Sequence, residues 1–247
     1  MVNDFFSGAT YVLRGMRLIF DRRFLPWVLT PIIINIVVFI VLLSLTIIYF
    51  TPIKDFLFDF IPAWPEWIKW LLYPVIISAL FLLLLMTQLI LSSLIAAPFN
   101  TQLSHQIELH LSPQQKSIPT KSALVTQTLG AIRDEIIKIS YFLIRALPIL
   151  LLYLIPVINI LAAILWIILC IRMLAIEFCE YPMGNHDLSF KKQRGLLKSR
   201  RTLSLTFGAT LLLLTMIPFV NLLLIPSAVA GATLMWIEKF KQENTHP

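Results

Sequence analysis

Three arginines next to the first long apolar segment are the clearest candidates for chemistry. Arg22 and Arg23 are adjacent and directly precede an uncharged segment, and Arg17 comes a little over one helical turn earlier. Guanidinium groups present forked donors that match the oxygens of a tetrahedral oxyanion. Basic residues beside a membrane segment also anchor it and contact lipid headgroups. The sequence therefore predicts either an oxyanion site or a membrane anchor at these arginines.

Neutral polar side chains occur inside the apolar segments, from which charged side chains are absent. We consider Asn35, Asn159 and Asn221 as candidates to line an anion pore. Helix N-termini exposed by breaks at Pro156 and Pro218 would assist them, since a helix start offers unpaired N–H donors and a partial positive charge. The alternative is that the asparagines hold helices together by hydrogen bonds.

The sequence gives little support to catalysis, and we expect no enzyme, metal site or cofactor. His105 and His110 are five residues apart, which does not place both on one helical face, and no acidic cluster accompanies them. No phosphate loop, Gly-rich dinucleotide turn or nucleophile elbow is present in the sequence. Cys170 and Cys179 have neither a metal spacing nor a disulfide pattern, and we interpret them as free and structural.

The composition is that of an integral membrane protein. Of the 247 residues, 58% are hydrophobic and only 13% are charged, and the mean hydropathy is +0.85. The net charge of +7 is interpreted as loop charge that sets orientation, with no nucleic-acid partner expected.

Four uncharged segments each exceed the roughly 20 residues that a spanning helix needs. They are residues 24–53, 70–104, 146–171 and 202–237. Lys and Arg number 4 in residues 1–23, 2 in 54–69, 5 in 105–145 and 7 in 172–201. Because basic loops stay on the cytoplasmic side, only residues 54–69 are expected outside, and the N-terminus and the main basic loops are expected inside. The first two segments are thus predicted to cross the membrane fully.

The third and fourth segments are predicted to be Pro-broken re-entrant hairpins that penetrate only partly. Residues 146–171 lie between two basic segments, so their crossings must be even in number, yet they are too short for two full spans. Both 146–171 and 202–237 contain an Ile-Pro-x-x-Asn break, at Pro156 and at Pro218. The alternative is that each proline kinks an ordinary buried helix.

The predicted fold is therefore an all-α integral membrane protein with a single membrane domain over residues 1–247. Residues 1–23 are predicted to form an amphipathic helix in the membrane interface, because their apolar residues recur at helical spacing. Residues 105–145 are predicted to form a cytoplasmic helical region, and 172–201 a basic cytoplasmic segment.

Five sequence motifs occur in one order along nearly the whole chain. They are RRFLPWVLTPIIIN over 22–35, IAAPFN over 95–100, EYP over 180–182 with His186 and Phe190, MIPFVNL over 216–222, and PSAVAGATLMW over 226–236. Together they closely resemble the CysZ sulfate transporters of bacterial inner membranes.

This resemblance implies sulfate uptake across the bacterial inner membrane into the cytoplasm, supplying sulfur for cysteine biosynthesis. It also implies an oxyanion site at the arginine pair that Arg22 and Arg23 match, with Gly15 and Arg17 close to it. Sulfite and other tetrahedral oxyanions are further candidate substrates. Two long spanning helices with shorter, partly penetrating hairpins are the fold that the family implies.

The mechanism is left as channel-like or proton-dependent. Because the apolar segments have no ionisable side chains, a proton-dependent mechanism would need groups at their boundaries, of which Glu177 and His186 are the main candidates, with Glu180 and Asp187. Few polar residues are available to line a pore within one chain, so we expect a homo-oligomer in contact with membrane lipid. The competing hypothesis is a non-conducting membrane scaffold or regulator of another transporter.

Overall fold

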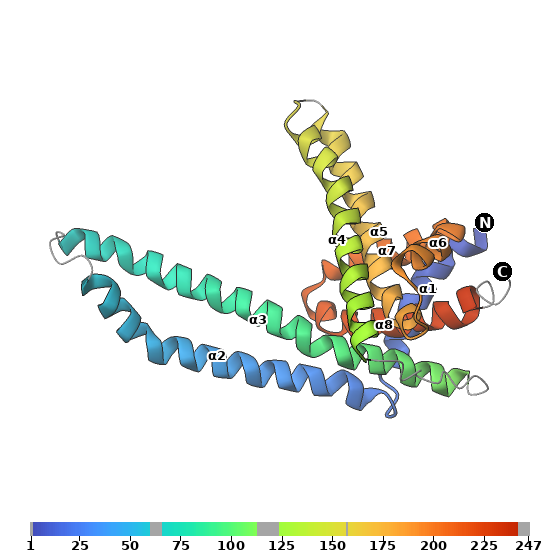
Figure 1. Cartoon of the computed structure of the whole chain (residues 1–247), viewed down its shortest axis with the longest axis horizontal. Helices are drawn as coiled ribbons and strands as arrows, with labels where there is room; N and C mark the ends of the chain where they lie inside the picture. The colour runs from blue at the N-terminus through green and yellow to red at the C-terminus, as the bar shows by residue number, and fades with distance from the viewer. Residues whose placement is uncertain (1, 60–65, 113–123, 157, 242–247) are drawn as a thin grey trace. The chain divides into compact units, whose positions relative to one another are not determined.

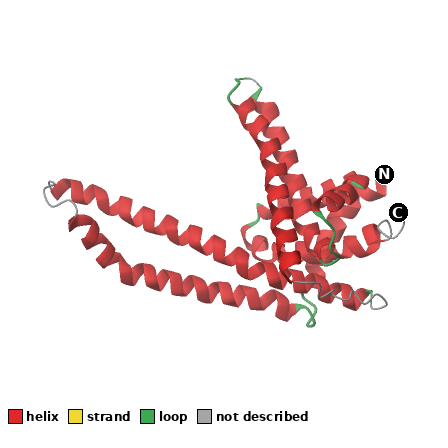
Figure 2. Ribbon diagram, in the orientation of Figure 1, coloured by secondary structure: helices red, strands yellow, loops and turns green. Residues whose placement is uncertain are grey.

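The computed structural model describes residues 2–59, 66–112, 124–156 and 158–241, and over these residues it contains helices and turns without strands (Figures 1 and 2). The helices are α1 (Val2–Leu18), α2 (Leu25–Asp59), α3 (Glu66–Leu111), α4 (Leu124–Tyr153), α5 (Asn159–Gly184), α6 (Phe190–Ser199), α7 (Arg201–Thr215) and α8 (Pro218–Met235), followed by the π-helical turn η1 (Trp236–Phe240). The predicted all-α fold is confirmed.

Within these ranges, five helical segments are long and apolar enough to cross a membrane. They are Leu25–Asp59, Trp70–Leu111, Arg133–Tyr153, Asn159–Gly184 and Leu223–Phe240. In the first of them no residue of the most apolar window is buried inside the molecule. Such a continuous exposed apolar surface is stable in lipid and not in water, so the chain is a multi-pass membrane protein.

One structural unit, Pro26–Phe99, consists of most of α2 and α3 running side by side (Figure 1). Gln88 Nε2 donates a hydrogen bond of 3.3 Å to the main-chain oxygen of Asn35. Nearer the other end of the pair, the rings of Phe58 and Tyr73 meet edge to face at 5.4 Å. The two helices need few such polar and aromatic contacts, because the apolar side chains on the outside of the pair contact lipid.

The other unit, Met1–Leu25 with Asn100–Pro247, has its core around α8. All residues from Pro226 to Trp236 are buried, and α1, α5 and α7 pack around them. Small residues allow the backbones to approach closely: a Cβ on Gly15 of α1 would overlap the backbone of Ser227 and Gly231 of α8. A Cβ on Gly208 of α7 would likewise overlap the carbonyl of Ile171 on α5. This pattern of small residues at helix crossings is common in membrane proteins.

Two helix breaks shape this unit. α4 and α5 form a hairpin whose turn contains Pro156, and Asn159 is the first residue of α5 (Figure 1). α7 and α8 are separated at Met216 and Ile217, and Pro218 begins α8, where its missing N–H has no cost. That each hairpin turn ends within the bilayer, and does not cross it fully, stays a prediction.

Candidate functional site

The arginine pair lies in a tight turn between α1 and α2. The main-chain N–H of Asp21 donates to the oxygen of Leu18 at 3.0 Å, and that of Phe24 donates to the oxygen of Asp21 at 2.9 Å. The Asp21 carboxylate accepts a further bond of 3.1 Å from the main-chain N–H of Arg23. Phe24 is buried at 2% exposure, whereas the side chains of Arg22 and Arg23 are exposed. The buried phenylalanine thus fixes the turn from which the arginines project.

Arg23 has a partner that the sequence analysis did not find. Its Nη1 lies 2.6 Å from Nε2 of His110, on the last turn of α3, where the guanidinium donates to the imidazole. The His110 ring also packs edge to face with Phe24 at 6.0 Å. In the described part of the chain Arg22 has no hydrogen-bond or ion-pair partner. One guanidinium of the pair is therefore oriented by the protein, and the other is available to an anion.

Gly15 and Arg17 lie on different sides of α1. Gly15 faces α8 at the helix crossing described above, so its contribution is to let α1 approach α8. Arg17 is exposed in the last turn of α1, one turn before the arginine pair, and no described residue pairs with it. Its positive charge adds to that of the nearby Arg22 and Arg23.

The start of the arginine turn is positioned by contacts between α1 and η1. Glu238 accepts two bonds from the Arg14 guanidinium, at 2.5 and 3.0 Å, and a third from the Tyr11 hydroxyl at 2.8 Å. Burial, together with the Glu238 carboxylate, raises the pKa of the Tyr11 phenol, and the bond to Glu238 raises the pKa of the Arg14 guanidinium. Both groups therefore keep their protons and keep donating to Glu238 across the physiological range.

His186 belongs to a buried cluster around Glu108. Nε2 of His186 lies 2.9 Å from both carboxylate oxygens of Glu108, and Lys241 Nζ lies 2.6 Å from Oε1. Glu108 is only 4% exposed, and the His186 ring lies 5.1 Å from that of Trp236, with the two ring planes tilted by 41°. Glu108 was missed in the sequence, although Asn100, Leu103, Ser104, Ile107 and Glu108 follow the spacing of one helix face, and all five are buried.

Glu177 belongs to a second cluster, around Lys138 of α4. Lys138 Nζ lies 2.8 Å from Glu180, 2.9 Å from Glu135 and 3.2 Å from Glu177. Glu177 and His186 thus have separate partners in the described residues, and the structure does not join them into one relay.

The three asparagines occupy separate elements. Asn35 lies in α2, and its side-chain oxygen is buried with no hydrogen-bond partner among the described residues. Asn159 is exposed at the start of α5. Asn221 lies in the first turn of α8, and its side chain is outside the described part of the structure.

Among the described residues, no group of three or more His, Cys, Asp or Glu could hold a metal ion. The chemistry that the described site offers is binding of an anion by arginine.

Comparison with known proteins gives one consistent result. A family model described as "Sulfate transporter CysZ/Etoposide-induced protein 2.4" matches residues 11–226. A protein named sulfate transporter CysZ from Pseudomonas fluorescens (strain Pf0-1) is 35% identical over 96% of this chain and 96% of its own length. Proteins of the same name from Pseudomonas syringae pv. tomato and Pectobacterium atrosepticum are 36% and 32% identical, covering 94% and 95% of this chain and 92% and 86% of their own lengths.

Proposed function

Because this chain belongs to the sulfate transporter CysZ/etoposide-induced protein 2.4 family, we propose that it takes up sulfate across the membrane into the cytoplasm. The observation that carries the proposal is the exposed arginine turn in a chain that resembles sulfate transporters over almost its whole length. Sulfur for cysteine biosynthesis is the expected use of the imported sulfate. Sulfite and tetrahedral oxyanions other than sulfate share the negative charge and the acceptor oxygens that this turn would recognise.

The proposed sulfate site consists of Arg22 and Arg23, with Arg17 adding charge and Gly15 setting the position of α1. A sulfate at the turn would accept bonds from the free guanidinium of Arg22 and from the donors of Arg23 that do not face His110. The main-chain N–H groups of Phe24 and Leu25 both donate to the oxygen of Asp21, so the proposed anion donors are the guanidinium groups of the arginines.

The proposed path through the membrane uses neutral groups at depth. Asn35, Asn159 and Asn221 are the proposed pore-lining side chains, and the unpaired acceptor of Asn35 supports a hydrated path near it, since a buried acceptor without a partner is costly in a dry environment. The pore would be completed by further copies of the chain in a homo-oligomer surrounded by lipid. In a proton-dependent mechanism, His186 or Glu177 would carry the coupled proton.

The proposed topology places α2 and α3 fully across a bacterial inner membrane, with the hairpins α4–α5 and α7–α8 penetrating partly from the cytoplasmic side. The counts of basic residues support this orientation, because residues 54–69 alone are poor in Lys and Arg. The N-terminus and the loops that flank the hairpins would then be cytoplasmic.

The test of transport is the flux of radiolabelled sulfate into liposomes that contain only the purified chain, with and without a pH gradient. Flux without the gradient establishes a channel-like pathway, and flux that requires the gradient establishes proton coupling. No flux under either condition would contradict transport and favour a membrane scaffold or regulator of another transporter.

The test of the site is the double variant Arg22→Ala/Arg23→Ala. We expect it to remain folded and to lose sulfate binding by at least about tenfold, because charge-assisted bonds to an oxyanion each contribute on the order of 1.5–3 kcal/mol. The matched control is Lys191→Ala/Lys192→Ala, an adjacent and exposed basic pair on α6. If the arginine variant and the lysine control bound sulfate with equal affinity, the arginine pair would be excluded from the proposed site.

A further inference from the structure

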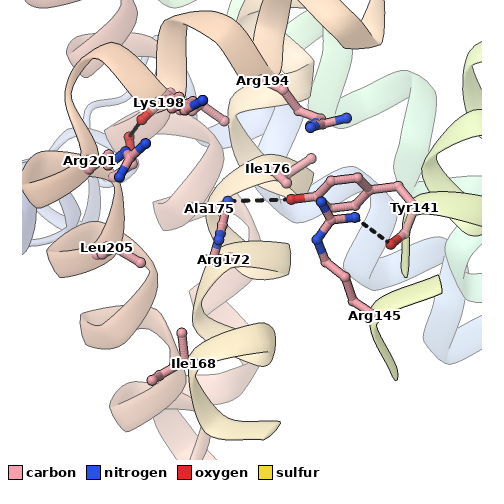
Figure 3. Close-up of a pocket in the computed structure, with 12 residues that line it drawn as sticks. Tyr141, Arg145, Ile168, Arg172, Ala175, Ile176, Arg194, Lys198, Arg201 and Leu205 are labelled. Atoms are coloured by element: carbon pink, nitrogen blue, oxygen red, sulfur yellow. Dashed lines mark hydrogen bonds between the residues drawn. The ribbon is translucent and has the colours of Figure 1, made fainter. Parts of the chain in front are cut away.

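A basic cavity of about 420 Å³ lies between α4, α5, α6 and α7, in the unit that contains α8 (Figure 3). Five of its lining side chains are cationic and none is a carboxylate. The cations come from all four helices: Arg145 of α4, Arg172 of α5, Arg194 and Lys198 of α6, and Arg201 of α7. Four separate elements therefore direct positive charge to one place.

Tyr141 organises three of these cations around its ring. The guanidinium of Arg145 lies 3.6 Å from the ring centroid and that of Arg194 lies 4.0 Å from it, while Arg172 Nη2 donates to the Tyr141 hydroxyl at 3.4 Å (Figure 3). A cation–π contact orients a guanidinium and leaves its net charge in place. In the described residues none of the five cations has a carboxylate partner. Like charges so close together repel one another, and a bound anion would remove this repulsion.

The sequence places the cavity at a membrane boundary. Arg145 and Arg172 are the charged residues that flank the apolar segment 146–171, and Arg201 directly precedes the apolar segment 202–237. The helices α4, α5 and α7 therefore each continue from the cavity into an uncharged, apolar segment. Basic residues at this level of a membrane protein meet the phosphates of the lipid headgroups.

An exposed apolar strip on α5 leads away from the cavity. Ile160, Ile164 and Ile168 precede Arg172 at four-residue intervals and so lie on one face of the helix. They are 70%, 52% and 43% exposed, and Ile168 also lines the cavity. Charge at one end and apolar surface at the other match a ligand with an anionic head and an acyl chain.

We propose that this cavity binds the phosphate headgroup of an anionic phospholipid, with an acyl chain along the Ile160–Ile164–Ile168 strip of α5. Free phosphate or sulfate offers the same oxyanion chemistry, but neither would use the apolar strip, and either is small for the cavity. The proposal does not depend on sulfate transport, since the arginine pair Arg22 and Arg23 does not line the cavity.

The test compares lipid binding to the full-length chain and to the variant Lys198→Gln/Arg201→Gln. These two cations are chosen because both are exposed and neither stacks on Tyr141, so that folding is retained. The purified protein is titrated in neutral detergent with phosphatidylglycerol and, separately, with phosphatidylcholine, and bound lipid is measured by native mass spectrometry. We expect the wild type to prefer phosphatidylglycerol and the variant to lose at least about tenfold of that affinity.

The matched control is Lys191→Gln/Lys192→Gln, which removes the same charge from exposed positions of α6 that do not line the cavity. It should keep the preference within about twofold of the wild type. Equal losses in the two variants would overturn the site, because they would show a general effect of net charge. If Lys198→Gln/Arg201→Gln does not fold, Arg172→Gln replaces it in the same measurement.

Inorganic phosphate and sulfate, tested as competitors of phosphatidylglycerol at millimolar concentration, separate the two sources of the oxyanion. Retention of the lipid in their presence supports the proposal. Displacement of the lipid by either ion, together with binding of that ion that is lost in Lys198→Gln/Arg201→Gln, would identify a free-anion site and overturn the assignment to lipid.

Discussion

Glu108 carries a charge in a nearly closed environment, and two donors offset the cost of burying it. His186 and Lys241 both reach its carboxylate within 2.9 Å, and Trp236 covers the imidazole. A buried ion pair of this kind contributes modest net stability, but removing one member leaves the other unpaired at a large cost. The cluster ties the end of α3 to the segment after α5 and to the residue after η1.

The variant Glu108→Gln should lower the free energy of unfolding by about 2–4 kcal/mol, because it removes the buried carboxylate that accepts from both His186 and Lys241. Chemical unfolding of the detergent-purified protein measures this change. The control is Glu135→Gln, since Glu135 is about half exposed and Lys138 keeps two other carboxylates. The control should lose less than about 1 kcal/mol. Similar losses of unfolding free energy in both variants would show that burial of the carboxylate does not determine how much it contributes to stability.

At the scale of elements, the crossing of α1 and α8 determines where the arginine turn begins. Gly15 meets Ser227 and Gly231, and a Cβ on Gly231 would lie 2.7 Å from the main-chain oxygen of Tyr11. Both helices therefore use glycine at their closest approach, which leaves no room for a larger residue. The bonds from Tyr11 and Arg14 to Glu238 then fix the rotation of α1.

Gly15→Val should separate α1 from α8 and lower the free energy of unfolding by about 1–3 kcal/mol or more, as overpacking does in other cores. Sulfate binding should weaken in the same variant, because the turn at Arg22 would move with α1. Gly195→Ala is the control, since nothing lies within 4 Å of a Cβ at that position of α6. The control should be neutral or more stable by about 0.5–1 kcal/mol. A neutral Gly15→Val would contradict the packing role.

At the scale of the whole molecule, five helical segments among the described residues could span a membrane by length and composition, whereas the loop charges predict two full spans and two partial hairpins. The difference concerns α4, α5 and α8, whose apolar lengths satisfy both interpretations. Only the position of each hairpin turn relative to the outer surface separates them.

Cysteine labelling distinguishes these topologies in intact cells, in a background where Cys170 and Cys179 are replaced by alanine. Leu154→Cys, in the exposed turn of the α4–α5 hairpin, should not react with a membrane-impermeant maleimide added outside. Trp67→Cys should react, because it lies near the predicted outer loop, and Lys192→Cys should not. Reaction at Leu154→Cys would establish that this hairpin crosses the membrane fully.

The sequence by itself determined the class of the fold and two of the places where the helices break. Uncharged segments longer than a bilayer requires can form only helices there, because every main-chain polar group must be satisfied within its own segment. Proline acts locally, so Pro156 and Pro218 predicted turns that the structure contains within a residue or two. The arginine pair was visible for the same reason, since its two residues are neighbours in the chain.

Only the tertiary structure decided which distant side chains meet. The contacts of His110 with Arg23 and of Glu108 with His186, and the gathering of five cations at one cavity, join positions on different helices, and no local pattern relates them. The rotation and crossing of the helices bring them together, and these depend on close packing at positions such as Gly15 and Gly208. Glu177 and His186 have separate partners for the same reason. Their nearness in the chain does not determine which neighbouring helix each side chain faces.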